Sequence, residues 1–143
     1  IIIRTSWFYS GFGNNFVKTM LKLGSERSQL KVIFDQIGTP TYAADLADAM
    51  LQIIDSGKFV PGIYHFSNEG VCSWYDFTKM IFKLANVECE VLPIESKDYA
   101  VRTPRPHYSV LNKSKLKSTY NQTIPYWMDG LERCLHVLQS QSK

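Results

Sequence analysis

The first side chains that point to chemistry follow a strongly apolar start of the chain. Ile1-Ile2-Ile3 contains no polar residue and predicts a strand buried on both faces, as in a parallel sheet. It runs directly into Arg4-Thr5-Ser6-Trp7, which is rich in hydrogen-bonding groups. Ligands of open α/β sheets bind beyond the carboxyl ends of the strands, so we expect this segment to border a ligand crevice. We also expect the strand to belong to a larger fold, because the chain begins inside it.

A second group of ligand-binding atoms is expected where the next helix begins. The glycine-containing loop after Trp7 ends in Asn14 and Asn15, either of which can cap a helix that runs to about Gly24. The free N–H groups of a helix N-terminus, together with asparagine amides, suit an anionic or hydrogen-bonding ligand. Capping alone explains the same two residues, so the pattern leaves both roles open.

A third candidate is Arg105, which stands between Pro104 and Pro106. The surrounding segment 95–112, which also contains Arg102, lacks helical or strand periodicity, and long loops of this kind are commonly functional. Because the two prolines restrict the backbone, the guanidinium would meet phosphate oxygens from a fixed position. A surface salt bridge is the alternative role for this arginine.

Other polar residues are expected to be structural. Asp45 and Asp48 are three residues apart on a helix predicted at 42–56, and we expect both on its solvated face. The opposite face carries an apolar stripe of Leu46, Met50, Ile53 and Ile54. A histidine at position 65, within a predicted strand, is expected to be a hydrogen-bonded part of the fold instead of a catalyst.

Composition narrows the class of protein. The 143 residues are enough for one domain or for one lobe of a larger protein, and the 45% hydrophobic and 20% charged residues are ordinary for a globular chain. A net charge of +3 without a basic stripe argues against nucleic acid, and no apolar run is as long as a membrane span. The three cysteines show no CxxC spacing, so we expect buried thiols in a reducing cytoplasm, with neither disulfides nor a zinc site.

The apolar pattern predicts an α/β fold with short strands and about four helices to position these groups. Thr41 is expected to cap the helix at 42–56 and Gly57 to end it in a left-handed conformation. Ser73 and Asp76 form a capping box that opens a helix to about Asn86. The other predicted elements are strands at 31–35, 62–68 and 90–94, one or two polar helical turns at 112–119, a helix at 125–139 and a frayed tail.

Four stretches of the sequence occur in a recognisable order. They are Arg4-Thr5-Ser6-Trp7-Phe8-Tyr9, Gly13-Asn14-Asn15-Phe16, Asp35-Gln36-Ile37-Gly38-Thr39-Pro40-Thr41 and Arg105-Pro106-His107-Tyr108-Ser109-Val110-Leu111. Together they resemble the C-terminal half of the dTDP-4-dehydrorhamnose reductase family, which belongs to the extended short-chain dehydrogenases. The similarity spans essentially all 143 residues, and four motifs in register are much more specific than any one of them. Tyr108 stands where the family pattern usually has asparagine.

The resemblance implies that residues 1–143 form the substrate-binding C-terminal domain of an extended Rossmann-type reductase, beginning in a strand of the missing Rossmann domain. The complete protein would transfer hydride from NADPH to the 4-keto group of a dTDP-sugar, the last step to dTDP-L-rhamnose. We expect the dTDP-sugar as its partner and a homo-oligomeric assembly, with no nucleic-acid or membrane partner.

Four residues match binding positions of the family. By resemblance, Trp7 contacts the substrate, Asn15 and Phe16 border the nucleotide-sugar pocket, and Arg105 lies near the diphosphate. For Trp7 the alternative is that its ring fills the gap between sheet and lobe. The resemblance implies no catalytic, cofactor-binding or metal-binding residue within this chain.

The groups that perform the family's chemistry are absent from this sequence. There is no glycine fingerprint after a first strand to hold the pyrophosphate of NADPH. Tyr75 and Lys79 have the spacing of a Tyr-x-x-x-Lys pair, but they follow the Arg4–Trp7 segment, whereas the family's pair precedes it. We therefore interpret the spacing as coincidental and predict that this chain alone is inactive.

Two other functions fit the same residues. The parent protein could be a non-catalytic, reductase-like binding or regulatory subunit, or another sugar-nucleotide enzyme such as an epimerase or dehydratase. The residues upstream of this chain would distinguish these possibilities, because they would contain or lack the glycine fingerprint and the Tyr-x-x-x-Lys pair.

Overall fold

The computed structural model describes residues 1–99 and 103–141 as an elongated α/β molecule. Five α-helices occur in the described residues: α1 (Phe16–Glu26), α2 (Ala43–Asp55), α3 (Trp74–Ala85), α4 (Ser114–Tyr120) and α5 (Trp127–Gln141). The strands are β1 (Ile2–Arg4), β2 (Phe8–Tyr9), β3 (Gln29–Ile33), β4 (Ile37–Gly38), β5 (Thr41–Tyr42), β6 (Ile63–His65), β7 (Cys72–Ser73) and β8 (Glu90–Ile94). A 3-10 turn covers Ser96–Asp98.

The described strands pair two by two instead of forming one wide sheet. Three pairs are parallel, namely β1 with β6, β2 with β5 and β3 with β8, and the pair of β4 with β7 is antiparallel. Parallel neighbours require long crossover connections, and helices supply them, as α2 does between β1 and β6. The fold class predicted from the sequence, α/β, is therefore confirmed.

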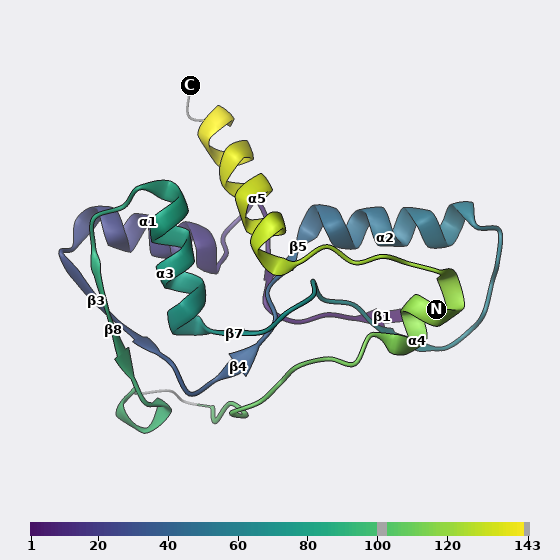
Figure 1. Ribbon diagram of the computed structural model, residues 1–143, viewed down its shortest axis with the longest axis horizontal. Helices are drawn as coiled ribbons and strands as arrows, with labels where there is room; N and C mark the ends of the chain where they lie inside the picture. Colours follow the sequence, from purple (N-terminus) through teal and green to yellow (C-terminus); the bar gives the residue numbers. More distant parts are fainter. Residues whose placement is uncertain (100–102, 142–143) are drawn as a thin grey trace.

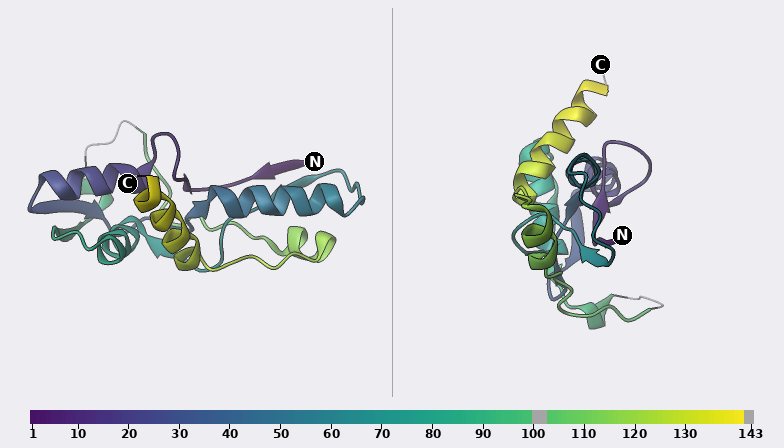
Figure 2. Two further views of the ribbon diagram at one scale, coloured as in Figure 1. Left: turned by 90° about the horizontal axis from the view of Figure 1, so that it is seen from above. Right: turned by 90° about the vertical axis from the view of Figure 1, so that its right-hand side faces the viewer.

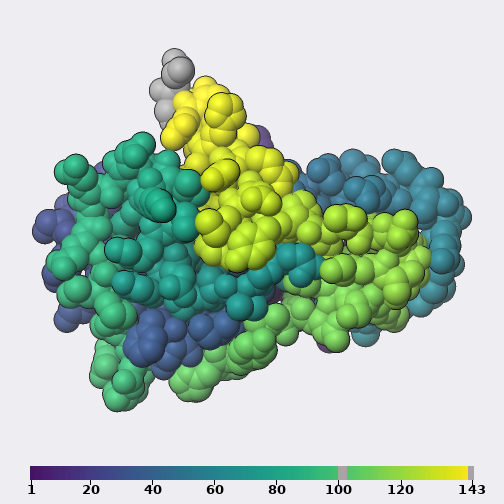
Figure 3. Space-filling model, viewed as in Figure 1, coloured from purple at the N-terminus to yellow at the C-terminus, as the bar shows by residue number. Residues whose placement is uncertain are grey.

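The molecule has two hydrophobic cores along its length. The larger one lies among α1, α3, α5, β3 and β8, and the smaller one lies among α2, α4 and the β1–β6 pair. Figure 1 shows α1, α3, β3 and β8 at one end and α2, α4 and β1 at the other, with α5 between them. Figures 2 and 3 show the C-terminal end of α5 projecting beyond the body.

Local sequence signals located most helix ends correctly. Asn15 caps α1 by accepting a hydrogen bond from the Lys18 amide at 3.2 Å, and Ser73 and Asp76 form the predicted capping box of α3. Gly57 has a φ of 62°, as expected after the end of α2. The helix count of about four is corrected to five, because the polar turns at 112–119 form the complete helix α4.

Thr41 does not cap α2. It belongs to β5, where its hydroxyl accepts a hydrogen bond from the Thr5 hydroxyl at 3.2 Å, and the N-cap residue of α2 is Tyr42. The capping rule failed here because pairing of β5 with β2 places the threonine inside a strand.

The prediction for Asp45 is wrong. The side chain is 4% exposed, and it shares the buried face of α2 with Ala49 and Ile53. Met50 and Ile54, which were expected in the core, are exposed instead. The helix is thus rotated relative to the apolar stripe, and the buried carboxylate of Asp45 pairs with Arg133 of α5, which is itself half-exposed.

The first strand also differs from its prediction. In this structure Ile2 is 59% exposed and β1 pairs only with β6 among the described residues, so it is not buried on both faces. Ile3 packs against the smaller core, which covers one face of the strand.

The predicted buried thiols are found at two of the three cysteines. Cys72 and Cys134 are buried and Cys89 is half-buried, and all three are free. Burial raises the pKa of Cys134 to about 11, so this thiol stays protonated at neutral pH.

Among the described residues, no group of three or more His, Cys, Asp or Glu side chains is arranged to hold a metal ion. Within residues 1–99 and 103–141, no helix has the length and apolar character that crossing a membrane requires.

Candidate functional site

A cavity of about 590 Å³ lies where the segment after β1 meets the loop that carries Arg105. Trp7 and Arg105, which are far apart in the sequence, both line it. Its complete lining in the described structure is Ser6, Trp7, Ile33, Gln36, Trp74, Arg105, Pro106 and Ser109. The cavity therefore combines aromatic rings, amide and hydroxyl groups, and one guanidinium.

The backbone of Trp7 is held in an unusual conformation. Its φ is 46°, in the left-handed region that bulky residues rarely adopt and that costs of order 1–3 kcal/mol. Hydrogen bonds on both sides hold it: the Ser6 hydroxyl donates to the Thr39 carbonyl at 3.1 Å, and the Thr41 amide donates to the Trp7 carbonyl at 3.1 Å. Strain of this kind is concentrated at functional sites, which makes the tryptophan a strong candidate.

The indole of Trp7 packs against a second tryptophan. Its ring and that of Trp74 are stacked, with centroids 3.5 Å apart and planes 9° apart. Gly38 lies close to the same indole, since a Cβ added there would be 2.5 Å from Trp7 Cε2. The ring thus packs against Trp74 and Gly38 inside the fold, and it lines the cavity as well.

The loop with Arg105 is fastened to the segment around β4. The Ile37 amide donates to the His107 carbonyl at 2.8 Å, and the Ser109 amide donates to the Ile37 carbonyl at 2.9 Å. Arg105 itself is exposed and, in the described part of the chain, forms no ion pair. The surface salt bridge considered for it is not found, which leaves its guanidinium open to a ligand. Arg102 lies outside the described residues.

A carboxylate beneath this loop is well stabilised as an anion. Asp35 Oδ1 accepts hydrogen bonds from the Ser96 hydroxyl at 2.6 Å and from the Ser96 amide at 2.9 Å. The Ser96 hydroxyl is the main cause that holds the pKa of Asp35 below its usual value. The Nδ1 atom of His107 lies 3.4 Å from the other carboxylate oxygen, so Asp35 links the loop to β3 and β8.

Asn15 and Phe16 do not line this cavity. The Asn15 amide donates to the Ser10 carbonyl at 2.8 Å while its oxygen caps α1, so both ends of the side chain are used within the protein. Phe16 packs on Trp74, with ring centroids 4.5 Å apart, and borders a separate hollow of about 180 Å³. In this structure Asn15 supports the loop and Phe16 supports the neighbouring tryptophan.

Trp74 and Gln36 are cavity residues that the sequence reasoning did not single out. Gln36 was part of a recognised motif but received no role, and its amide donates to the Ser96 hydroxyl at 2.9 Å. Trp74 directly follows the cap residue Ser73 of α3. No local signal marks it, because its contact with Trp7 joins distant parts of the chain.

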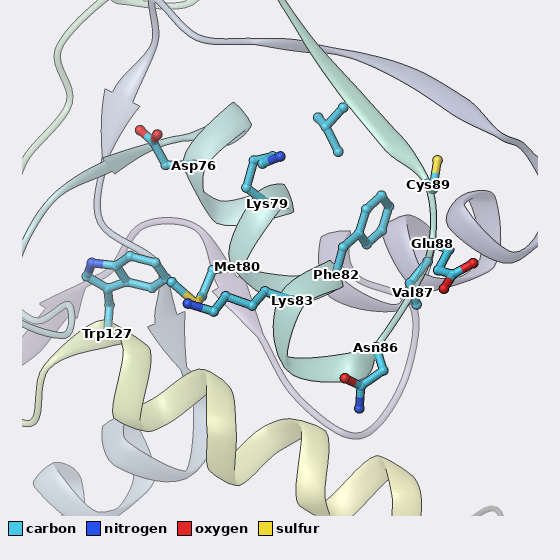
Figure 4. A pocket seen from close by; sticks show the side chains of 11 residues that line it. Asp76, Lys79, Met80, Phe82, Lys83, Asn86, Val87, Glu88, Cys89 and Trp127 are labelled. Carbon is cyan, nitrogen blue, oxygen red and sulfur yellow. The ribbon is translucent and has the colours of Figure 1, made fainter.

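Neither Tyr75 nor Lys79 lines this cavity. Lys79 is exposed on a different groove of about 650 Å³ along α3, shown in Figure 4, with Trp127 at one end and Cys89 at the other. Tyr75 is half-buried against the larger core and does not line that groove. Tyr75 and Lys79 therefore do not line one cavity together, which supports the interpretation that their spacing is coincidental.

Solved structures define the class of fold to which this lobe belongs. A dTDP-4-dehydrorhamnose reductase from Clostridium acetobutylicum is 41% identical, with a TM-score of 0.90 over 96% of this chain and 48% of that chain. The corresponding enzyme from Bacillus anthracis, solved in complex with NADP, is 44% identical, with a TM-score of 0.86 over 94% of this chain and 47% of that one. The lobe therefore has the fold of part of a reductase.

Family membership follows from the sequence match. Residues 1–140 match the model of the RmlD substrate binding domain, and the chain belongs to this family. A curated relative, the spore coat polysaccharide biosynthesis protein SpsK of Bacillus subtilis, is 49% identical over 97% of this chain and 48% of its own length. The chain spans about half the length of the curated relatives that it matches.

Proposed function

We propose that this chain is the C-terminal, nucleotide-sugar-binding portion of an NADPH-dependent dTDP-4-dehydrorhamnose reductase. The parent protein would transfer hydride to the 4-keto group of a dTDP-4-keto-6-deoxyhexose, which forms dTDP-L-rhamnose. Membership of the RmlD substrate binding domain family supports this proposal, as do the names of the similar solved structures. The name of SpsK is consistent with it, because polysaccharide synthesis consumes activated sugars.

One observation carries the proposal: the indole of Trp7 and the guanidinium of Arg105 border the same cavity. Indole rings pack well against sugars because they offer an apolar surface and an N–H donor. A guanidinium pairs with phosphate oxygens through charge-assisted hydrogen bonds. The pair therefore suits a ligand with an uncharged sugar at one end and a diphosphate next to it.

The residues of this chain do not fit NADPH. A dinucleotide-binding loop has the pattern Gly-x-Gly-x-x-Gly. Gly11 and Gly13 before α1 match its first two glycines, but Phe16 stands where the third glycine would be. The side chain of Asn15 already caps the first turn of that helix. We therefore assign hydride transfer and proton donation to the remainder of the parent protein, and we expect this chain by itself to be inactive.

The other functions considered make different demands on the parent protein. A non-catalytic subunit would bind the nucleotide sugar without turnover, and an epimerase or dehydratase would convert it without net consumption of NADPH. An assay of the complete protein with NADPH and a dTDP-4-keto sugar separates the reductase from the other two, because only the reductase oxidises the cofactor stoichiometrically.

Steady-state kinetics of the complete reductase test the binding role. Trp7→Ala is expected to weaken substrate binding by about 1–3 kcal/mol, and Trp7→Phe should recover part of that loss. Arg105→Met should raise KM similarly, whereas Lys97→Met removes a nearby exposed charge that does not line the cavity and should leave KM unchanged. Unchanged KM and kcat in both Trp7→Ala and Arg105→Met would contradict the proposed site.

A further inference from the structure

The ring of Trp7 does not hold its position alone. Its backbone is strained, and its indole makes two contacts with other elements: it stacks on the ring of Trp74 and lies close to Gly38. Trp74 is the first residue of α3, and the capping box of Ser73 and Asp76 fixes the start of that helix. The second indole is therefore presented from a rigid helix end.

We propose that Trp74 is a positioning residue for substrate binding, which orients the indole of Trp7 through their stack. This inference rests on the proposed function, since it concerns the same nucleotide-sugar cavity. Trp74 directly follows the helix cap Ser73 and is far from Trp7 in the sequence.

The geometry distinguishes Trp74 from an ordinary core aromatic. It is half-buried and lines the cavity itself, whereas the nearby Phe77 is buried and does not border it. Phe16 packs on Trp74 in turn, with ring centroids 4.5 Å apart. Phe16, Trp74 and Trp7 thus form a continuous aromatic series that ends at the cavity.

The stack has a consequence for how a ligand can meet Trp7. Trp74 covers one face of the Trp7 indole at van der Waals separation, so a sugar must use the remaining surface or the N–H edge. Loss of Trp74 would free the ring to rotate away from the productive orientation. Binding should weaken, while the chemical step, which uses groups outside this chain, should change less.

Circular dichroism can detect the stack directly in this chain. Two stacked indoles couple their electronic transitions and produce an exciton couplet in the far ultraviolet. The chain contains three tryptophans, and the third, Trp127, has no ring contact with the other two in the described structure. The couplet should disappear in Trp74→Phe and Trp74→Leu and persist in the matched control Trp127→Phe.

A second variant, at Gly38 of β4, disturbs the position of the Trp7 ring without removing either indole. In Gly38→Ala the added Cβ would lie 2.5 Å from Trp7 Cε2, so the ring must move. The melting temperature of each variant shows whether it folds. If Trp74→Leu does not fold, Gly38→Ala still decides the question.

Kinetics of the complete reductase then test the functional part. Trp74→Leu and Gly38→Ala should raise KM about tenfold with kcat within about twofold, and Trp74→Phe should stay within about threefold of the wild-type KM. A folded Trp74→Leu or Gly38→Ala variant with an unchanged KM overturns the positioning role and leaves the proposed function intact. A wild-type protein that does not turn over or bind the dTDP-sugar overturns both.

Discussion

Arg133 of α5 reaches the buried carboxylate of Asp45 on α2, with Nη2 2.7 Å from Oδ1. The Asn68 amide donates to the same carboxylate at 2.6 Å, and the Asn68 side-chain oxygen accepts from the Tyr42 amide at 2.9 Å. A carboxylate that is 4% exposed needs such partners, because burial of an unpaired charge is strongly unfavourable. The network therefore joins the central helix to the end of the molecule that contains the smaller core.

Replacement of Arg133 tests this network. Arg133→Met should lower the free energy of unfolding by about 2 kcal/mol, because it leaves the buried Asp45 carboxylate without its cationic partner. The loss is moderate because the Arg133 side chain is half-exposed in the wild type. Arg133→Lys should recover part of that loss. Urea unfolding provides the measurement, with Glu132→Met as an exposed neighbour expected within about 0.5 kcal/mol of wild type. Equal stability of Arg133→Met and Glu132→Met would show that the pair contributes little.

The pH dependence of the Arg105 loop should depend on Asp35. Since the folded-state pKa of Asp35 is lowered, its contribution to stability is complete above the unfolded-state pKa, near 3.9, and is lost as the pH falls through the folded value. Ser96→Ala should raise the folded pKa, as measured by NMR titration of the Asp35 carboxyl carbon. Ser109→Ala removes a hydroxyl bonded to Ile37 instead and should leave the titration unchanged. An unaltered titration in Ser96→Ala would exclude the hydroxyl as the cause.

The exposed side of β1 predicts self-association of this chain. Ile1, Ile2 and Ile63 are 40%, 59% and 45% exposed, and Ile2 and Ile63 lie opposite each other in the β1–β6 pair. A strand with an open edge and apolar side chains is a template for pairing with another copy. Light scattering over a dilution series should show a dimer that dissociates on dilution. Ile2→Lys should abolish the dimer. Ile54→Lys, which introduces the same charge at an exposed apolar residue of α2, should not. A monomer at every concentration would contradict the prediction.

The chain alone should show no reductase activity. Its sequence contains neither a complete glycine fingerprint nor a Tyr-x-x-x-Lys pair before the Arg4–Trp7 segment, and these groups together provide many powers of ten in rate. NADPH absorbance should stay constant when the chain is mixed with the cofactor and a dTDP-4-keto sugar, while the complete protein should consume NADPH in the same assay. Oxidation that requires the keto sugar and survives repurification would show that the chain is catalytic.

The parts of the fold that the sequence predicted well are those that local chemistry determines. The Asn15 cap, the capping box at Ser73 and the left-handed Gly57 depend on residues within one helical turn, and all three are confirmed. The strand at 90–94 was placed correctly because an apolar run bounded by polar residues marks it. These signals do not depend on how the chain folds at longer range.

The failures share a cause in contacts between distant segments. Asp45 looked like a surface residue, because nothing near it in the sequence shows that Arg133 would pair with it. The cavity was only half-predicted for the same reason. The motifs identified Trp7 and Arg105, but Trp74 reaches the site through a stack that joins α3 to the segment after β1. Asn15 and Phe16 were expected beside the ligand and instead support the loop and the stacked ring.

The most direct test of the central claim is an NMR titration of the complete reductase, labelled with ¹⁵N at its tryptophan indoles, with dTDP-rhamnose. Absence of a signal in Trp7→Phe assigns the Trp7 indole N–H, and Trp127, which is 4% exposed and does not line the cavity, serves as the internal reference. We predict a saturable shift of the Trp7 signal with little change at Trp127, and a shift in Arg105→Met only at much higher ligand concentration. A ligand that binds with the Trp7 signal unmoved would place the nucleotide sugar elsewhere and contradict the account.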